Sequence, residues 1–346
     1  MTTWDWVRKV GLVALTVVLV EYLAVPQLLK ARSELSLFAD ASVWLLLVAF
    51  ALEAGSLLAY TSLTQAVLRP GARLPFFTQF RIDLTGLGAS HVLPGGGASA
   101  AALRYRLMTT HGVATGDALS TAAVQSAIAI TGLVATFTGG VALALPGIVS
   151  HPGYLLAGLG GLAVLLAVGL TTRAGARASW ASAPPRVRRF EGAAPWRGSR
   201  WLLGQVNRTL AAGRTVLLRA VSLLQQQPGP RLALLGWAGA NWLLDAASLW
   251  VCLWAYGVTV HPGALLTAYG AANLIGLLPL TPGGLGVIEG VLIPSLIALG
   301  AQGGPVVLGV LTWRALEFWL PIPVAGVTYL SLRLRHRRSP APSPSG

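Results

Sequence analysis

Four charged residues lie in or beside segments that are otherwise apolar: Arg104, Glu289, Arg314 and Glu317. A charge inside the hydrocarbon of a bilayer is costly, so it is retained chiefly where it has a partner or a function. Arginine presents a planar fork of donors that matches phosphate oxygens, whereas a carboxylate can hold a cationic group or a proton. These residue types predict a site for a charged, phosphate-bearing group at membrane depth, with Arg104 and Arg314 as the phosphate ligands.

Each of the four residues also has a purely structural interpretation. Arg314 and Glu317 are three residues apart, so on a helix they share a face and can neutralise each other. Glu289 can stabilise the N-terminus of its own helix, and Arg104 can extend its guanidinium group to the membrane interface. In the functional interpretation, Glu317 releases the phosphate or carries a proton, and Glu289 holds a cationic headgroup or a proton. The residues alone leave both interpretations open.

Further polar residues inside apolar segments are secondary candidates. Asn241 and Asp245 are four residues apart and therefore share a helix face, from which they can form hydrogen bonds to other helices. Asn273 is a third candidate, and Glu53 lies in an apolar segment without a partner that the sequence can name. The scattered histidines and the single cysteine predict neither a metal site nor a bound cofactor. No nucleophile–base pair or acid cluster indicates an intramembrane enzyme.

The composition predicts an all-α polytopic membrane protein. The chain is 54% hydrophobic and 10% charged, whereas a soluble domain carries about 25% charged residues. The net charge of +14 does not indicate nucleic-acid binding, because most basic residues flank the apolar segments as topology determinants do. Segments near the roughly 20 residues that a spanning helix needs predict about six full spans. They are residues 10–29, 42–66, 117–145, 153–172, 231–256 and 305–331.

The basic residues orient these spans with both termini in the cytoplasm. The stretch 173–231 carries eleven arginines and one acid, and so belongs on the cytoplasmic side. Within this linker (173–230), a helical period over 200–227 predicts an amphipathic helix on the membrane surface, and a solvated linker helix is the alternative. The last residues, 332–346, are predicted to form a disordered basic tail.

A self-similarity at an offset of 188 residues predicts an internal repeat. The matching positions are Gly88 with Gly276, Pro94-Gly95-Gly96 with Pro282-Gly283-Gly284, Gly112 with Gly300, and Gly116 with Gly304. Repeat one covers about 42–172 and repeat two about 231–331. The long helices that follow the two Pro-Gly-Gly motifs run in opposite directions in the predicted topology, so the repeats would be inverted, as in many transporters.

Each Pro-Gly-Gly motif predicts the tip of a helical hairpin, at about 82–108 and 264–301. The hairpins are expected to be re-entrant, although full crossing of both arms, giving about eight or more spans, has the same parity. A turn at membrane depth must be buried in protein or line a wet cavity, because lipid cannot satisfy its backbone groups. The following helix directs free N–H groups at such a cavity, which suits a phosphate. A tight helix–helix turn with packing glycines is the alternative.

These motifs resemble a known family. His91-Val-Leu-Pro-Gly-Gly-Gly through Arg104, and Leu278-Pro-Leu-Thr-Pro-Gly-Gly-Leu-Gly-Val-Ile-Glu289, resemble signatures of the lysylphosphatidylglycerol synthase transmembrane (flippase-like) family. Thr312-Trp-Arg314 through Pro321 resembles its closing motif, and the likeness covers about 8–331. The resemblance implies a single flippase domain over 1–331, without the aminoacyl-transferase domain of some members. It implies membrane lipids as partners, anionic or aminoacylated phospholipids, in a bacterial inner membrane.

The leading hypothesis is therefore transbilayer movement of a phospholipid or lipid-linked headgroup. The headgroup would pass through a cavity between the two inverted hairpins, with its phosphate held by Arg104, Arg314 and N–H groups of the tips. The alternative is a proton- or ion-coupled transporter of a small polar solute that uses the same carboxylates. An enzyme acting on a lipid phosphate ranks last, because the required metal or nucleophile cluster is missing from the sequence pattern.

Overall fold

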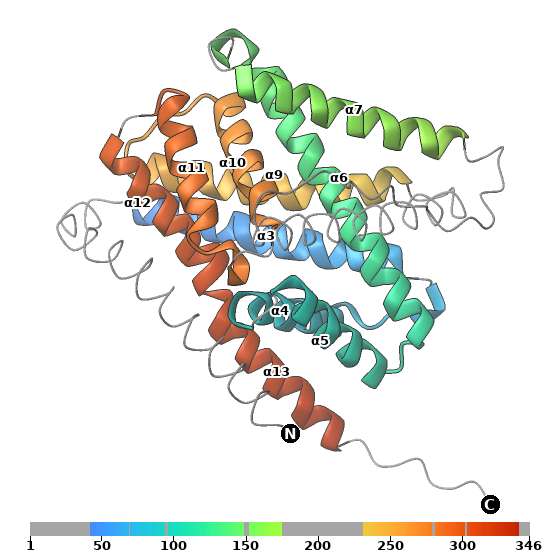
Figure 1. Ribbon diagram of the computed structural model, residues 1–346. Coiled ribbons are helices and arrows are strands. Elements are labelled where there is room, and N and C mark those ends of the chain that lie inside the picture. The colour runs from blue at the N-terminus through green and yellow to red at the C-terminus, as the bar shows by residue number, and fades with distance from the viewer. Residues whose placement is uncertain are drawn as a thin grey trace, which may run out of the picture.

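The computed structural model describes residues 42–68, 70–93, 96–148, 152–174, 231–278, 281–301 and 303–338. In this part of the chain all regular structure is helical, without a β-strand (Figure 1). The helices are α3 (Val43–Val67), α4 (Phe76–Val92), α5 (Gly97–Thr110), α6 (Thr115–Ile148), α7 (Pro152–Ala174), α9 (Arg231–Ala255), α10 (Pro262–Gly276), α11 (Val287–Ala298), α12 (Gly303–Arg314) and α13 (Pro321–Arg338). Short 3-10 turns cover Pro70–Ala72 and Pro282–Gly284, and a π-helical turn covers Ala315–Trp319.

Three of the helical segments are long and apolar enough to cross a bilayer. They are Val43–Val67, Thr115–Leu145 and Gly304–Leu334, with mean hydropathies of 1.9, 2.0 and 1.3. Large apolar side chains such as Trp44 and Leu159 are 71% and 63% exposed, which in water would be unfavourable and in lipid is expected. The all-helical membrane architecture is thus supported, while the full count of spans stays a prediction because the segment 10–29 lies outside the described residues.

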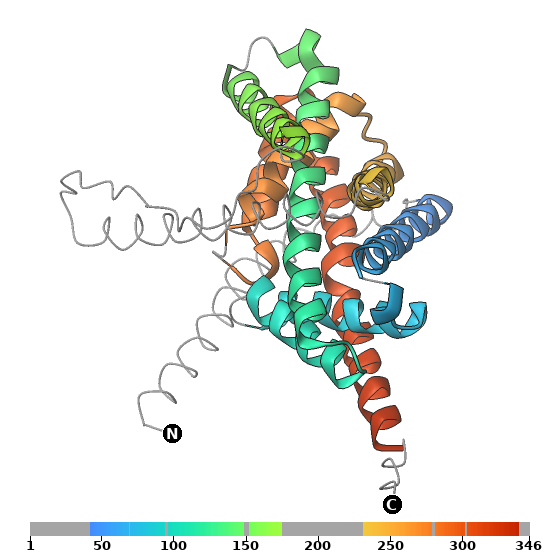
Figure 2. The same ribbon diagram turned by 90° about the vertical axis from the view of Figure 1, so that its right-hand side faces the viewer.

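Helices α3 and α9 lie side by side and run antiparallel. Ser56 pairs with Asn241, whereas Ala49, seven residues earlier on α3, accepts a hydrogen bond from Ser248, seven residues later on α9. In both views this pair lies across the long helices α6 and α13, and Figure 2 looks almost along its axes. The pair therefore forms a crossbar between the two halves of the chain.

Two helical hairpins occupy the regions predicted from the Pro-Gly-Gly motifs. The first consists of α4 and α5, and the second of α10 and α11. The tip of the second hairpin contacts the end of α4, where a Cβ atom added to Gly283 would lie 2.9 Å from His91 Cδ2. Each hairpin also packs against a long helix of the other half, α10 on α6 and α4 on α13. The hairpins thus join the halves at a second place besides the crossbar.

The 188-residue offset seen in the sequence also relates the helix bounds. Helices α3 and α9 both have 25 residues, and they begin at residues 43 and 231. The paired glycines share unusual backbone conformations: φ is +48° at Gly96 and +69° at Gly284, and +94° at Gly112 and +102° at Gly300. A left-handed backbone favours glycine because it has no Cβ atom. Two of the glycine matches therefore share a positive φ at corresponding positions.

The contact between α6 and α10 depends on glycines, and one of them gives a testable expectation. Replacing Gly140 with alanine would place a Cβ atom 2.6 Å from Thr267 N and 2.7 Å from Leu266 C, both backbone atoms. Gly140→Ala is expected to lower the free energy of unfolding by about 1–3 kcal/mol through overpacking, measured by thermal unfolding in detergent. Gly139→Ala is the matched control, because its Cβ would meet nothing within 4 Å. Equal stability of the two variants would contradict this packing.

The last predicted span differs from the expectation of one helix over 305–331 with a tail from 332. The helix is interrupted by the π turn Ala315–Trp319, in which Leu320 N–H donates to Ala315 O at 2.9 Å. Pro321 and Pro323 explain the interruption, since each lacks an N–H and its ring would clash with the carbonyl four residues earlier. Helix α13 then continues to Arg338, so residues 332–338 are helical rather than part of a disordered tail. Most of the predicted cytoplasmic linker, including the helix 200–227, lies outside the described residues.

Candidate functional site

The first group of buried charges surrounds Arg314, the last residue of α12, whose side chain is almost completely buried. Its Nε donates to Glu289 Oε1 at 2.6 Å, and its Nη1 donates to Glu317 Oε2 at 2.7 Å. A longer contact of 3.4 Å joins Nη2 to the carbonyl of Gly283 at the tip of the second hairpin. The guanidinium group therefore ties the π turn to the second hairpin, and two carboxylates neutralise it.

Glu289 has a second task in the same group. Its Oε2 accepts a hydrogen bond from the backbone N–H of Gly286 at 2.7 Å, which caps the N-terminus of α11. Gly286 adopts a φ of +79°, the left-handed conformation that lets the chain turn from the tip into α11. Both structural interpretations from the sequence, the helix-terminal acid and the Arg314–Glu317 pair, are thus present in one cluster.

His91 links this group to the first hairpin. Its Nδ1 lies 3.0 Å from the carbonyl oxygen of Phe318, and its ring stacks on Phe318 with centroids 4.3 Å apart. Its Nε2 is 4.0 Å from Glu317 Oε1. The π turn provides this carbonyl as an acceptor, since widening a helix turn changes its hydrogen-bond pattern, and such turns are frequent at functional sites.

The second group of buried charges surrounds Arg104 of α5. Its Nη2 donates to Asp83 Oδ1 of α4 at 2.6 Å and to Gln125 Oε1 of α6 at 2.7 Å. Its Nη1 donates to Tyr60 Oη of α3 at 2.9 Å. The stem of Arg104 lies over Gly86, where any Cβ atom would collide with its Cγ and Cδ atoms. One arginine therefore joins four helices.

A polar stripe on α3 connects the two regions of charge. Glu53, Ser56, Tyr60 and Thr64 follow one another at spacings of three, four and four residues, so they lie on one helix face. At 1.5 Å of rise per residue the stripe is about 16 Å long. Tyr60 and Thr64 contact Arg104 at one end, and Glu53 lies beside Asp245 at the other.

Asp245 of α9 is held by two aromatic donors. The hydroxyl group of Tyr269 donates to Oδ2 at 2.7 Å, and the indole Nε1 of Trp313 donates to Oδ1 at 2.6 Å. Four residues earlier, Asn241 Nδ2 donates to Ser56 Oγ at 2.8 Å. The two secondary candidates on α9 therefore face α3, as their shared helix face predicts.

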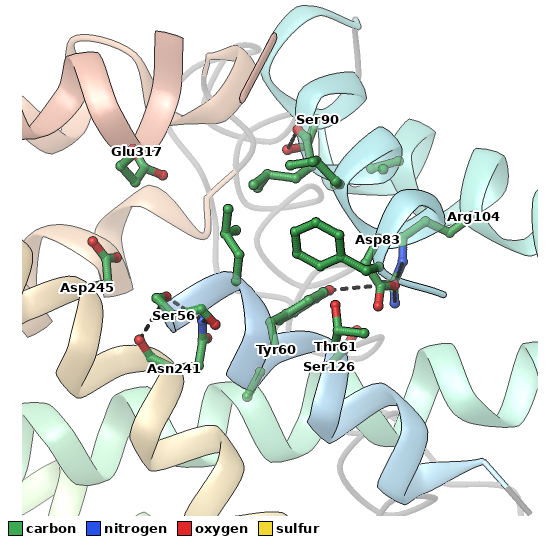
Figure 3. A pocket seen from close by; sticks show the side chains of 18 of the residues that line it. Ser56, Tyr60, Thr61, Asp83, Ser90, Arg104, Ser126, Asn241, Asp245 and Glu317 are labelled. Carbon is green, nitrogen blue, oxygen red and sulfur yellow. Dashed lines mark hydrogen bonds and ion pairs between the residues drawn. The ribbon is translucent and has the colours of Figure 1, made fainter. Parts of the chain in front are cut away.

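Some of these side chains line one cavity of about 330 Å³. Figure 3 shows Arg104 and Asp83 at one side of it and Asp245 and Glu317 at the other. The cavity is bounded by α3, α4, α5, α6, α9 and the π turn. Its charged lining residues are Glu53, Asp83, Arg104, Asp245 and Glu317. Four carboxyl groups against one arginine make the wall acidic, whereas the sequence predicted a site with two arginines and two acids: Arg104, Arg314, Glu289 and Glu317.

The predicted site residues are only partly brought together. Arg104, Glu317, Asn241 and Asp245 line the cavity. Arg314, Glu289 and the turn Pro282–Gly284 are not among its lining residues, so the cavity lies against the first hairpin rather than between the two. Asn273 is not in the lining either, and its Nδ2 donates to the carbonyl of Tyr269 at 3.0 Å. Gly96 precedes the first turn of α5, and Pro94 and Gly95 lie outside the described residues.

Several site residues were not among the sequence-based candidates: Tyr60, Asp83, His91 and Gln125. For α3, a signal did exist in the spacing of its polar residues, because a stripe at helical period inside an apolar span indicates a face turned away from lipid. For Asp83 and Gln125 no comparable signal is present. Their relation to Arg104 depends on how α4, α5 and α6 cross.

Comparison with known proteins agrees with this architecture. Residues 9–325 match the family model described as lysylphosphatidylglycerol synthase TM region. A UPF0104 membrane protein of Methanothermobacter thermautotrophicus is 40% identical over 67 residues, which are 19% of each chain. The Inner membrane protein YbhN of Escherichia coli K12 is 26% identical over 101 residues, 29% of this chain and 31% of that protein. These matches span less than a third of either relative. The family match, in contrast, covers most of the chain, which therefore belongs to the family of the lysylphosphatidylglycerol synthase transmembrane region.

Proposed function

We propose that the protein moves a phospholipid or lipid-linked headgroup across a bacterial inner membrane by way of the acidic cavity. One observation carries the proposal: a cavity lined by charged residues lies within a helical membrane protein of this family. Its volume of about 330 Å³ is near the lower end of the roughly 300–1,000 Å³ of ligand pockets. A headgroup fits such a space, while the acyl chains would stay in the surrounding lipid.

The charges of the cavity favour a headgroup with a cationic part. Arg104 is already paired with Asp83, and Arg314 with Glu289 and Glu317. A phosphate would have to compete with these carboxylates, whereas an amine would meet Glu53 and Asp245, which pair with neither arginine. Of the acids that line the cavity, Glu317 is the most accessible, with 21% of its side chain exposed. We therefore expect an aminoacylated or amine-bearing phospholipid to be preferred over a purely anionic one.

The proposed movement uses two inverted repeats. Two observations support this part. Helices α3 and α9 have equal lengths and begin 188 residues apart, and they pack against each other in antiparallel directions. Two equivalent helices that run in opposite directions are what an inverted repeat requires. Rocking of one repeat against the other would open the cavity to alternate sides of the membrane.

The function can be tested with purified protein in lipid vesicles. Headgroup-labelled lipids with and without an amine are followed by a quencher that reaches only the outer leaflet. Faster exchange is expected in protein-containing vesicles, and fastest for the amine-bearing lipid. Glu317→Gln is expected to slow it about tenfold or more, since an ionic hydrogen bond contributes about 1.5–3 kcal/mol. Asp117→Asn, an acid that does not line the cavity, is the control. Equal rates in empty and protein-containing vesicles for every lipid would overturn the proposal.

The excess of carboxyl groups also supports a second candidate, a proton- or ion-coupled transporter of a small polar solute. Such a protein would accumulate a soluble substrate in vesicles when an ion gradient is imposed. Solute uptake without lipid exchange would favour this candidate, and lipid exchange without uptake would exclude it.

A further inference from the structure

Glu53 of α3 and Asp245 of α9 form a buried pair of carboxyl groups. Only 5% of Glu53 and 8% of Asp245 is exposed, and the two carboxyl groups are within hydrogen-bonding reach of each other. The two residues come from the antiparallel helices that form the crossbar between the halves. The pair therefore lies at the contact between α3 and α9.

The partners of the two carboxyl groups are unequal. Both oxygens of Asp245 accept hydrogen bonds, from Tyr269 and from Trp313. Glu53 Oε2 is buried and has no hydrogen-bond partner, although the side chain lines the cavity. Within the described residues, neither carboxyl group forms an ion pair with an arginine, because Arg104 and Arg314 bind other acids. A buried acceptor without a partner thus belongs to a residue that lines the acidic cavity.

Two adjacent buried carboxylates without a cation are strongly unfavourable, since each loses its hydration and repels the other. A single positive charge between them removes the repulsion, and the one negative charge that remains is stabilised by the two hydrogen bonds donated to Asp245. The other titratable groups that face the pair are Tyr269 of α10, Cys252 of α9 and Glu317 of the π turn. At neutral pH an ordinary tyrosine or cysteine adds no positive charge, and Glu317 adds a further negative one. Among the described residues neither arginine of the two clusters supplies this charge, whereas a small cation from solution would.

The number of ligands indicates which kind of cation fits. Calcium takes six to eight oxygen ligands, and magnesium needs near-ideal octahedral geometry. Groups of three or more acidic, histidine or cysteine ligands do not occur in the part of the chain that the structure describes. One free oxygen of Glu53 and the remaining lone pairs of Asp245 suffice for a proton, whereas a sodium ion would also need water or backbone oxygens to complete its ligand shell.

We propose that Glu53 and Asp245 bind one monovalent cation, a proton or Na⁺, and that its occupancy controls the contact between α3 and α9. With the cation bound, the two carboxyl groups hold the helices together. Without it, their repulsion favours separation of the halves. Cation binding itself stands apart from lipid movement, whereas coupling of the cation to movement rests on the function proposed above.

Cation binding is tested with purified full-length protein by thermal unfolding. One series replaces choline chloride with NaCl at constant ionic strength and pH, and a second lowers the pH without sodium. Wild-type protein is expected to gain thermal stability in one of the series, which identifies the ion. Glu53→Gln keeps the size of the side chain and removes one charge, so it is expected to lose that gain. Asp117→Asn is the matched control and is expected to keep it.

Three outcomes overturn the site: no gain in wild-type protein in either series, a gain that Glu53→Gln retains in full, or an equal loss in Asp117→Asn. If Glu53→Gln does not fold, Asp245→Asn takes its place in the same unfolding test and is expected to lose the stability gain as well. Lipid exchange under an imposed gradient of the identified ion separates the two proposals. An intact stability gain without lipid exchange would remove the flippase function and leave the cation site. Lipid exchange in vesicles without any effect of the cation on stability would overturn the cation site and leave the flippase function.

Discussion

Arg314→Ala is expected to lower the free energy of unfolding by about 3–5 kcal/mol, the loss typical when one partner of a buried ion pair is removed. The residue is only 1% exposed, and removal of its side chain leaves Glu289 and Glu317 without a cation. The gap would also separate the π turn from the tip of the second hairpin. Thermal and denaturant unfolding in detergent would measure the effect.

The charge and the geometry of Arg314 can be separated with two further variants. Arg314→Lys keeps the charge but cannot direct separate donors at Glu289, Glu317 and Gly283, so an intermediate stability is expected. The triple variant Arg314→Met, Glu289→Gln, Glu317→Gln removes all three charges and is expected to recover much of the lost stability. Arg333→Ala, at an exposed arginine of α13, should stay within about 0.5 kcal/mol of wild type. If Arg314→Ala were as stable as that control, the cluster would not stabilise the fold.

The second large effect is expected at Arg104. Arg104→Met leaves Asp83 buried without a cation, with neutral hydrogen-bond partners such as Gln79, and a loss of about 3–5 kcal/mol is expected. Asp83→Asn combined with Arg104→Met removes both charges and should be more stable than Arg104→Met alone. A double-mutant cycle from the four unfolding free energies measures the coupling, expected at about 0.5–3 kcal/mol. Arg106→Met, on the exposed face of the same helix, is the control.

Gly86 offers an independent test of the same cluster. A methyl group at this position would occupy the space of the Arg104 stem, so Gly86→Ala should displace the guanidinium group from Asp83. Because the displacement acts through Arg104, Gly86→Ala should be less harmful when Arg104 is already methionine. Gly326→Ala, where a Cβ meets nothing within 4 Å, should keep the stability or raise it by about 0.5–1 kcal/mol through helix propensity. Additive effects of Gly86→Ala and Arg104→Met would contradict the contact.

The helices were largely predictable because apolar length and punctuating Gly and Pro residues are local properties. The segment predicted over 231–256 is helix α9 at Arg231–Ala255, and the one predicted over 117–145 is α6 at Thr115–Ile148. The π turn was not predicted, although Pro321 and Pro323 are its physical cause. Proline patterns indicate an interruption of a helix but not which widened turn will accommodate it.

The site was predictable only as a set of costly charges. Arg104 and Arg314 were identified because charge in an apolar segment is itself a signal. Their partners were harder to name. Glu317 is close to Arg314 in sequence, whereas Asp83, Tyr60 and Gln125 reach Arg104 through the crossing of separate helices. The acidic character of the cavity depends on helix crossings for the same reason. Its four carboxyl groups come from four separate elements: α3, α4, α9 and the π turn.

The π turn before α13 has a consequence for the last helix. Each residue of an α-helix advances the direction of the side chains by about 100°, so a widened turn breaks the angular phase between α12 and α13. The phase of α13 must then be set by its lateral contacts, such as Thr328 with Thr85 and Ala325 with Gly88. Deleting one residue from Ala315–Trp319 would rotate α13 relative to α12. The lateral contacts of α13 could then be kept only by straining the connection between the two helices. Glu317 lies in the π turn between α12 and α13. The direction of its side chain into the cavity therefore depends on how α13 is rotated relative to α12.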